Sequence, residues 1–290
     1  MSSHHYDLLA KAFFHTRRVD RLLHLATKAR QEFALLVKHQ GFFDAFNEIA
    51  YSHDCSYKPR SGSFRRELFA WEKEVIAKHF PTPPSRVLVG GAGGGREAFA
   101  LAEQGYQVVA FEPTYDLAAQ MREQAQRQSL DVDAYVGNYQ VLWKPDASVV
   151  AEGSIPVLPA SNELGSFDAI LLGWGSLTHV YDPRDRQRLF EVCREMLAPG
   201  GRLLASYFGA SRNTNAAPGR LTRLKLALRK ARGVDPNDCF YIHAGFGHAF
   251  TPEEIEELAH NAGLEVVFTH AETLGTYPHC VLQKPRDSNR

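Results

Sequence analysis

The chain has 290 residues, of which 44% are hydrophobic and 23% charged, so it can bury a sizeable core and is not expected to be disordered. Its 33 basic and 33 acidic residues give a net charge of zero, which argues against nucleic acid or an acidic membrane surface as a partner. Four widely spaced cysteines and the lack of any apolar run near the roughly 18 residues of a membrane span predict a cytoplasmic globular protein without disulfides or structural zinc.

The first part of the chain, residues 1–82, is expected to form a helical N-terminal cap region. Val19, Leu22 and Leu23 recur at helical spacing, and a further helical pattern runs over residues 68–80. The prolines that follow fit neither a helix interior nor a central strand. We therefore expect a second domain over residues 83–290.

In that second part, short apolar runs alternate with helical patterns. Strands are expected over residues 86–89, 107–111, 132–136, 167–172 and 202–208, and two more near 265–269 and 280–283. Helices are expected over residues 96–104, from Thr114, after the N-cap Asp182, and after a capping box at residues 251–254. This alternation is typical of an α/β fold with a mostly parallel sheet covered on both faces.

A glycine-rich loop, Gly90-Gly91-Ala92-Gly93-Gly94-Gly95, joins the first of these strands to a helix. Glycine allows a tight turn and close approach of a ligand to the backbone, and the N–H groups at the helix start favour an anionic group. Glu112 ends the next strand, where a carboxylate can accept hydrogen bonds from ribose hydroxyls. This arrangement predicts a nucleoside-containing cofactor, either a nicotinamide or a methyl donor.

Together with the turn Leu197-Ala198-Pro199-Gly200-Gly201 and the segment Phe167–Leu172, these motifs resemble the class I, Rossmann-like S-adenosylmethionine-dependent methyltransferases over about 200 residues. The resemblance implies a seven-stranded, mostly parallel sheet with a C-terminal hairpin strand, S-adenosyl-L-methionine as cofactor, and residues upstream of the sheet folded over it. It also implies that Gly91, Ala92, Gly93, Gly95, Glu112 and Asn138 hold the cofactor. Asn138 could equally be an ordinary turn residue.

One position departs from the family. The acidic residue often found two places before the first cofactor-binding glycine, here Gly91, is replaced by Val89. The cofactor's ammonium group would then need backbone carbonyls or another acid, such as one at the end of the fourth strand or Glu97.

The residues after the fourth strand are the best candidates for chemistry. Gly173 and Trp174 are expected to contact the cofactor, with Trp174 facing the sulfonium or adenine, although it could instead pack in the core. His179 is the candidate general base, or else a histidine bonded to nearby backbone. Candidate substrate contacts follow at Tyr51, Tyr207, His243 and His248, and both of these histidines could meet His179 over the cleft. Histidines without fixed spacing are a poor metal signal, so no metal is expected.

An insertion over about residues 209–248 carries basic residues and no acid between 212 and 232. It is expected to contain an amphipathic helix whose basic side either recognises an anionic acceptor or is simply a solvated face.

We therefore expect a methyltransferase that acts on an O or N atom of a small-molecule or modest-sized acceptor, with no nucleic acid or membrane partner. A non-catalytic cofactor-binding regulatory or partner subunit and a nicotinamide-dependent oxidoreductase are the alternatives. The sequence has no Tyr-x-x-x-Lys pair of the kind many dehydrogenases use.

Overall fold

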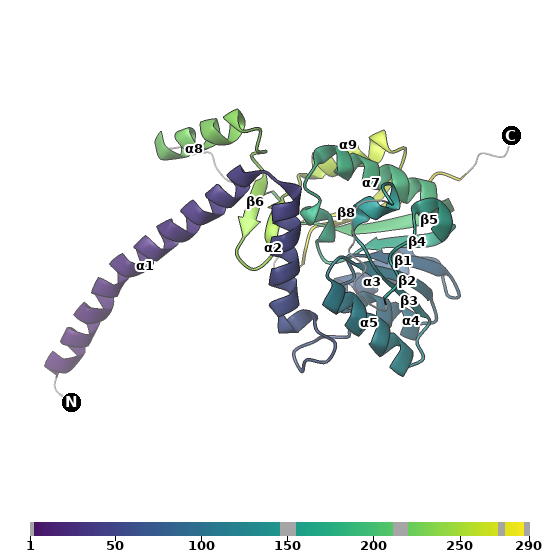
Figure 1. Cartoon of the computed structure of the whole chain (residues 1–290), viewed down its shortest axis with the longest axis horizontal. Helices are drawn as coiled ribbons and strands as arrows, with labels where there is room; N and C mark the ends of the chain where they lie inside the picture. Colours follow the sequence, from purple (N-terminus) through teal and green to yellow (C-terminus); the bar gives the residue numbers. More distant parts are fainter. Residues whose placement is uncertain (1–2, 146–154, 211–219, 272–275, 287–290) are drawn as a thin grey trace.

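The computed structural model describes residues 3–145, 155–210, 220–271 and 276–286. Their main feature is a seven-stranded sheet in the order β3-β2-β1-β4-β5-β9-β8 (Figure 1). The strands are β1 (Arg86–Gly90), β2 (Gln107–Glu112), β3 (Val132–Val136), β4 (Phe167–Leu172), β5 (Leu197–Ser206), β8 (Glu265–His270) and β9 (His279–Gln283). The first five run parallel, and β9 is antiparallel to both of its neighbours. The expected Rossmann-like sheet with a C-terminal hairpin strand is confirmed.

Helices cover both faces of this sheet. The helices of the described residues are α1 (Ser3–Val37), α2 (Gln40–His53), α3 (Ala70–His79), α4 (Arg96–Glu103), α5 (Tyr115–Arg127), α6 (Ser161–Leu164), α7 (Pro183–Met196), α8 (Arg220–Ala231) and α9 (Pro252–Asn261), of which α1 and α8 do not cover the sheet (Figure 1). Alternate residues of each strand bury on opposite faces: Val87 and Val89 pack with α3, α4 and α5, whereas Leu88 packs with α7 and α9. Because both faces are buried, the central strands are almost continuously apolar.

Two helices begin at the predicted caps. The Asp182 carboxylate accepts from the backbone N–H of Arg184 at 2.8 Å, and the Thr251 hydroxyl accepts from that of Glu254 at 3.2 Å. In each case proline occupies the first turn, where a missing N–H costs no helical hydrogen bond.

The fifth strand differs from the prediction. The Leu-x-Pro-Gly-Gly segment is not a separate turn before the strand: β5 begins at Leu197, immediately after α7. Leu197 pairs with Phe167, and the register then shifts so that Arg202 pairs with Ala169. A positive φ of 79° at Gly200 accommodates this bulge.

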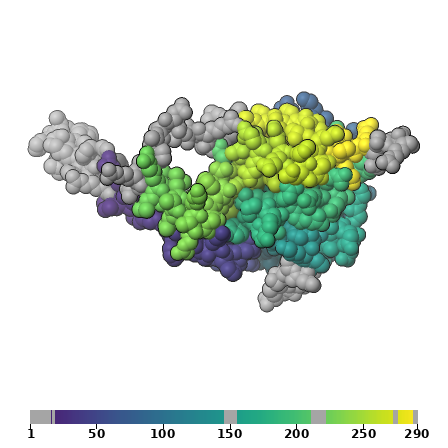
Figure 2. Space-filling model, turned by 90° about the horizontal axis from the view of Figure 1, so that it is seen from above, coloured from purple at the N-terminus to yellow at the C-terminus, as the bar shows by residue number. Residues whose placement is uncertain are grey.

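The N-terminal helix projects away from the sheet (Figure 1). Its helical periodicity is as expected, but the described part of the chain leaves the apolar stripe exposed: Leu22 is 67% and Leu23 62% exposed. In Figure 2, the residues of α8 lie beside this helix at one end of the molecule, apart from the sheet. Ala34 and Leu35, near the C-terminal end of α1, are buried.

Within the described part of the chain, none of the helices combines the length and the apolar character that crossing a membrane would require.

A second, two-stranded sheet was not predicted. The strands β6 (Asp238–Tyr241) and β7 (Gly245–His248) form an antiparallel hairpin within the insertion, for which the sequence predicted only a helix. Two glycines among the four residues of β7 hide the strand pattern. The hairpin is stabilised by aromatic packing, because Phe240 and Phe246 contact Phe43 of α2.

Candidate functional site

The glycine loop turns tightly between β1 and α4. Gly91, Gly93 and Gly95 have φ values of 64°, 55° and 96°, which L-residues rarely adopt. A Cβ atom on Gly91 would lie 2.5 Å from the Cβ of Ser176. The loop therefore needs glycine both for its backbone conformation and for the space around it.

Glu112 lies at the end of β2, next to this loop. It is buried, and its two carboxylate oxygens accept hydrogen bonds from the backbone N–H groups of Gly93 at 2.9 Å and Thr114 at 3.0 Å. Burial raises the pKa of Glu112, while these hydrogen bonds lower it less strongly. The Thr114 side chain also donates to this carboxylate, which has about four acceptor positions, so a position remains for a hydroxyl donor.

A cavity of about 500 Å³ lies over the loop and Glu112. It is closed on the far side by α2 and by the segment that follows it, which includes the 3₁₀ turn η1 (Cys55–Tyr57). Eight of the predicted site residues line it: Tyr51, Gly91, Ala92, Gly93, Glu112, Asn138, Trp174 and His179. The structure thus brings the ends of β1, β2, β3 and β4 together with the N-terminal helices around one space.

Asn138 caps the short 3₁₀ helix η2 (Tyr139–Leu142). Its side-chain oxygen accepts from the backbone N–H of Val141 at 3.3 Å. The residue lines the cavity and serves as a turn residue at the same time, so the two interpretations of the sequence are compatible.

Trp174 has a left-handed backbone, with φ of 31°, between two glycines. It is half-buried at the cavity wall, not in the core, and its ring lies 5.2 Å from that of Tyr57. The Arg96 guanidinium lies 5.6 Å from the Trp174 ring centroid. A strained backbone at a cavity wall is typical of functional sites.

His179 ends the 3₁₀ helix η3 (Ser176–His179), directly after β4. Its Nδ1 lies 2.6 Å from the carbonyl oxygen of Phe246, and its Nε2 lies 2.8 Å from the hydroxyl of Tyr51. A carbonyl only accepts, so Nδ1 carries the proton, Nε2 offers its lone pair, and the Tyr51 hydroxyl donates to it. Burial lowers the pKa of His179, although the Phe246 carbonyl opposes this. The ring is therefore neutral and basic at Nε2 at neutral pH.

Five predicted residues lie outside the cavity lining. Gly95 supports the loop from behind, since a Cβ there would meet Met121 and Phe99, and Gly173 lies behind the wall against Glu97. Tyr207 is buried in the core, His243 is exposed, and His248 is buried in a polar network. The suggested meeting of three histidines over the cleft is not seen, because the side chain of His248 faces carboxylates on β6 and α9.

A buried ionic cluster beside the cavity was largely missed. Arg96 donates to both oxygens of Glu72 on α3, at 2.6 and 2.7 Å, and to Glu97 at 2.5 Å. Arg96 and Glu97 line the cavity, and burial raises the pKa of Glu97. Among the described residues, Arg96 Nε has no hydrogen-bond partner. The only sequence signal was the pair of opposite charges directly after the glycine loop.

The basic helix of the insertion lies away from the cavity. Lys225 and Arg229 of α8 form ion pairs with Glu32 of α1, and neither lines the cavity. Residues 211–219, including the basic residue Arg212, lie outside the described part of the chain.

One group of described side chains, Asp235, Asp238 and His248, is close enough together to hold a metal ion. The Arg186 guanidinium lies 3.5 Å from the same Asp238 oxygen that faces His248 Nδ1. Because this cation already occupies the surroundings of the carboxylate, we interpret the group as an ion-pair network.

A Rossmann-like sheet with a glycine loop after β1, an acid ending β2 and a cavity over both defines a class I, S-adenosylmethionine-dependent methyltransferase. The profile of the family described as "Methyltransferase domain" matches residues 62–268, so the chain belongs to that family.

Solved structures share this fold. A SAM-dependent methyltransferase from Methanosarcina mazei is 19% identical, with a TM-score of 0.55 over 76% of this chain and 100% of that one. A protein from Pyrococcus horikoshii OT3 is 16% identical, with a TM-score of 0.51 over 81% of this chain and 98% of that one. A comparison with curated proteins gives no match.

Proposed function

We propose that this protein transfers the methyl group of S-adenosylmethionine to an oxygen or nitrogen atom of a small-molecule acceptor. The observation that carries the proposal is the single cavity that joins the glycine loop and Glu112 to the Tyr51–His179 pair. One end offers what a nucleoside-containing cofactor needs, and the other offers a base. S-adenosylmethionine supplies the methyl group on a cationic sulfur, so the protein's tasks are to hold, to orient and to remove a proton.

The cofactor site is supported by unfilled hydrogen-bonding capacity. Glu112 has an acceptor position left for a ribose hydroxyl, and Asn138, which lines the same cavity, is proposed to hold the adenine. Arg96 Nε is a buried donor without a partner in the described part of the chain. We propose that this donor binds the carboxylate of the cofactor's methionine part. Glu97 is a cavity-lining acid that can accept the ammonium group in place of the acid absent at Val89. Trp174 is proposed to face the sulfonium.

The proton step is assigned to His179. Its lone pair at Nε2 receives the Tyr51 hydroxyl proton in a hydrogen bond, so an acceptor bound against Tyr51 can lose its proton to Tyr51 while Tyr51 passes its own to His179. Burial, followed by the charge of Glu112, raises the pKa of Tyr51, which keeps the phenol protonated between turnovers.

We propose an aromatic acceptor without negative charge. Aromatic side chains dominate the cavity lining beyond the loop, including Tyr57, Phe69 and Tyr181, and planar rings pack well against them. Asp44 and Glu48 of α2 add acidic groups to the wall, and the basic helix α8 does not line it. Of the two arginines in the lining, Arg65 is exposed and Arg96 is paired with Glu72 and Glu97. The anionic acceptor suggested by the basic insertion is therefore not favoured.

Isothermal titration with S-adenosylhomocysteine and with NAD tests the cofactor site. We expect S-adenosylhomocysteine to bind and NAD not to. Glu112→Gln should weaken S-adenosylhomocysteine binding about tenfold to a hundredfold, because a hydrogen bond to a charged group contributes about 1.5–3 kcal/mol.

Asp133→Asn, an exposed acid on the neighbouring strand β3, is the matched control and should leave the affinity unchanged. Tight NAD binding without S-adenosylhomocysteine binding would identify an oxidoreductase instead. Cofactor binding without transfer to any acceptor would identify a regulatory or partner subunit.

A further inference from the structure

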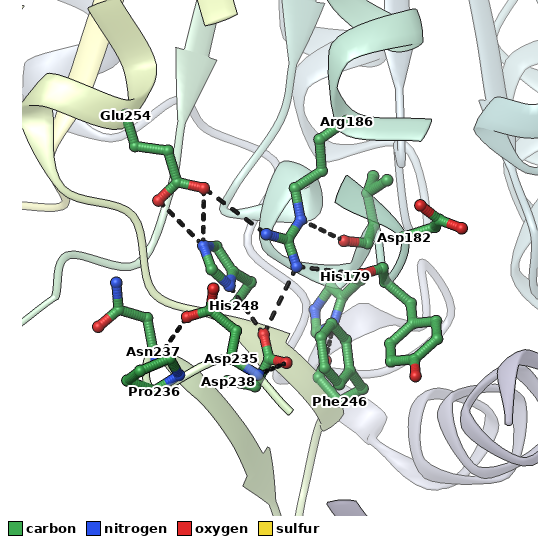
Figure 3. A network of polar contacts seen from close by, with 12 residues as sticks. His179, Asp182, Arg186, Asp235, Pro236, Asn237, Asp238, Phe246, His248 and Glu254 are labelled. Carbon is green, nitrogen blue, oxygen red and sulfur yellow. Dashed lines mark hydrogen bonds and ion pairs between the residues drawn. The ribbon is translucent and has the colours of Figure 1, made fainter. Parts of the chain in front are cut away.

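Behind the candidate base lies a buried polar network centred on His248 (Figure 3). His248 is 1% exposed, and each of its ring nitrogens faces a carboxylate: Nδ1 lies 2.8 Å from Asp238 on β6, and Nε2 lies 2.9 Å from Glu254 on α9. The Arg186 guanidinium of α7 lies 3.5 Å from Asp238 and 3.6 Å from Glu254. The network therefore ties the β6–β7 hairpin to two helices that cover the sheet.

The geometry specifies the charge of His248. Ionised carboxylates only accept hydrogen bonds, so both ring nitrogens must carry protons for both contacts to form. The carboxylates of Asp235, Asp238 and Glu254 lie around the ring, and Arg186 is the cation that faces Asp238 and Glu254. A charged imidazolium reduces this excess of negative charge.

The other charged and titratable groups near His248 do not cancel the excess of negative charge around its ring. Arg229 of α8 donates to the backbone carbonyl of Asp238 but is itself paired with Glu32. Tyr181 faces Asp238 as a neutral phenol, since burial and then Asp238 raise its pKa. Burial lowers the pKa of His248, but its hydrogen bonds to Asp238 and Glu254 outweigh burial and leave the pKa raised.

The same network holds both sides of the His179 hydrogen bond. Phe246, whose carbonyl accepts from His179 Nδ1, is two residues before His248 on β7. Arg186 donates to the carbonyls of Val180 and Tyr181, the two residues that follow His179, at 2.9 and 3.0 Å. The donor and the acceptor of the 2.6 Å contact are therefore both attached to the ionic cluster.

We propose that protonated His248 is a positioning residue that holds the Phe246 carbonyl against His179 and thereby keeps the proton of His179 on Nδ1. This inference rests on the proposed function, in which His179 Nε2 must offer a lone pair. His248 touches neither cofactor nor acceptor and acts through the hairpin alone.

The pH dependence follows from the direction of the His248 shift. A group whose pKa is raised in the folded protein contributes stability that is complete below its ordinary pKa of 6.5 and is lost as pH rises through the folded value. Above that value neutral His248 can donate to one carboxylate only. The hairpin then loosens, and His179 loses the acceptor that fixes its tautomer. His179, whose own pKa is lowered, sets the acidic limit and His248 the alkaline limit of the working range.

Nitrogen NMR of the full-length protein labelled at histidine tests this without cofactor or acceptor. At neutral pH we expect His248 as an imidazolium and His179 as the neutral Nδ1–H tautomer. On raising the pH, His179 should shift towards mixed tautomers with the same midpoint at which His248 loses its proton. A His248 that titrates below 6.5, or a His179 signal that ignores the His248 transition, would overturn the proposal.

Glu254→Gln separates positioning from folding. The amide can donate to Nε2, so neutral His248 keeps both contacts and the His179 tautomer should no longer change on the alkaline side. Glu257→Gln, on the exposed side of the same helix, should behave as the parent protein does. If Glu254→Gln folds and its His179 still changes tautomer as before, the network is not the cause. Displacement of the His248 protons by micromolar Zn²⁺ would likewise overturn the proposal in favour of a metal site.

Failure of this inference can be told apart from failure of the proposed function. If His179 proves dispensable for methyl transfer while its tautomer still follows His248, the coupling holds and only the assignment of the base fails. If S-adenosylhomocysteine binds and His179 is needed for transfer, but its tautomer does not respond to His248, the assignment of the base stands and the coupling fails.

Discussion

The tautomer of His179 depends on a single backbone carbonyl. Because Phe246 can only accept, the lone pair of the ring must lie on the opposite nitrogen, which is the one that faces Tyr51 and the cavity. A histidine on a similar turn without this carbonyl would populate both tautomers and act as a base for only part of the time. In the proposed mechanism, the Tyr51 hydroxyl is the group that takes the proton of the acceptor.

This arrangement predicts the effect of removing either partner. His179→Ala should lower methyl transfer about 10²- to 10⁴-fold, the usual contribution of a general base, while S-adenosylhomocysteine affinity changes less than about twofold. Tyr51→Phe should reduce transfer similarly but keep the cavity shape. Transfer of radiolabelled methyl groups to a panel of phenols and aromatic amines measures both. The exposed His243→Ala is the control, and unchanged turnover in His179→Ala would remove this residue from the mechanism.

A residue of the site could be predicted from the sequence where the local sequence alone determines its position. The glycine loop and Glu112 follow from strand, turn and helix order, because the ends of parallel strands meet at one edge. Tyr57, Arg96 and Glu72 could not be placed in this way. Their roles depend on the packing of the N-terminal segment against the sheet, which no short-range spacing encodes. His248 faces away from the cleft for the same reason: its partners come from β6 and α9.

Among the elements, α7 shows most directly how a local sequence signal, here the N-cap Asp182, determines where a helix begins. The Asp182 side chain satisfies a backbone N–H at the helix start and places the preceding turn, which carries His179, at the edge of the sheet. The strands and helices of the α/β domain were predictable because each has its own cap or apolar run. The β6–β7 hairpin was not, since its stability comes from contacts with α2 and from the buried ion pairs.

Asp182→Ala should therefore destabilise the protein by about 1 kcal/mol through the lost cap. For a domain of this size that corresponds to a fall in Tm of about 2–4 °C, measurable by calorimetry. Asp182→Asn retains an oxygen acceptor and should lose much less. Equal losses in the two variants would mean that the ion pair with Arg184, and not the cap, is the source of the stability.

For the whole molecule, the contribution of α1 to stability is concentrated at its C-terminal end. Ala34 and Leu35 pack with Phe43 and Phe246, and Glu32 pairs with Lys225 and Arg229. The described side chains from residue 19 to 25 are exposed. The apolar stripe read from the sequence correctly indicated a helix, but periodicity alone does not say what a helix packs against.

Removing residues 1–27 should therefore change Tm by less than about 2 °C, because the described side chains from residue 19 to 25 are exposed. Removing residues 1–36 should lower Tm by clearly more, since Glu32, Ala34 and Leu35 go with it. Differential scanning fluorimetry of the two truncated proteins gives the comparison. A large loss in the shorter truncation would show that residues before 28 have a partner that stabilises the fold.

The glycine loop supports three different surfaces at once. Gly91 turns towards Ser176 at the cavity wall, and Gly95 lies against Met121 and Phe99 in the core. A Cβ on Gly94 would lie 1.9 Å from the backbone oxygen of Tyr57, in the segment that covers the cavity. The density of glycines in this run thus reflects a junction between ligand, core and cover, and not the cofactor alone. A side chain at Gly91 should therefore weaken ligand binding, and one at Gly95 should lower stability. A side chain at Gly94 should displace the segment that covers the cavity and leave the rest of the site intact.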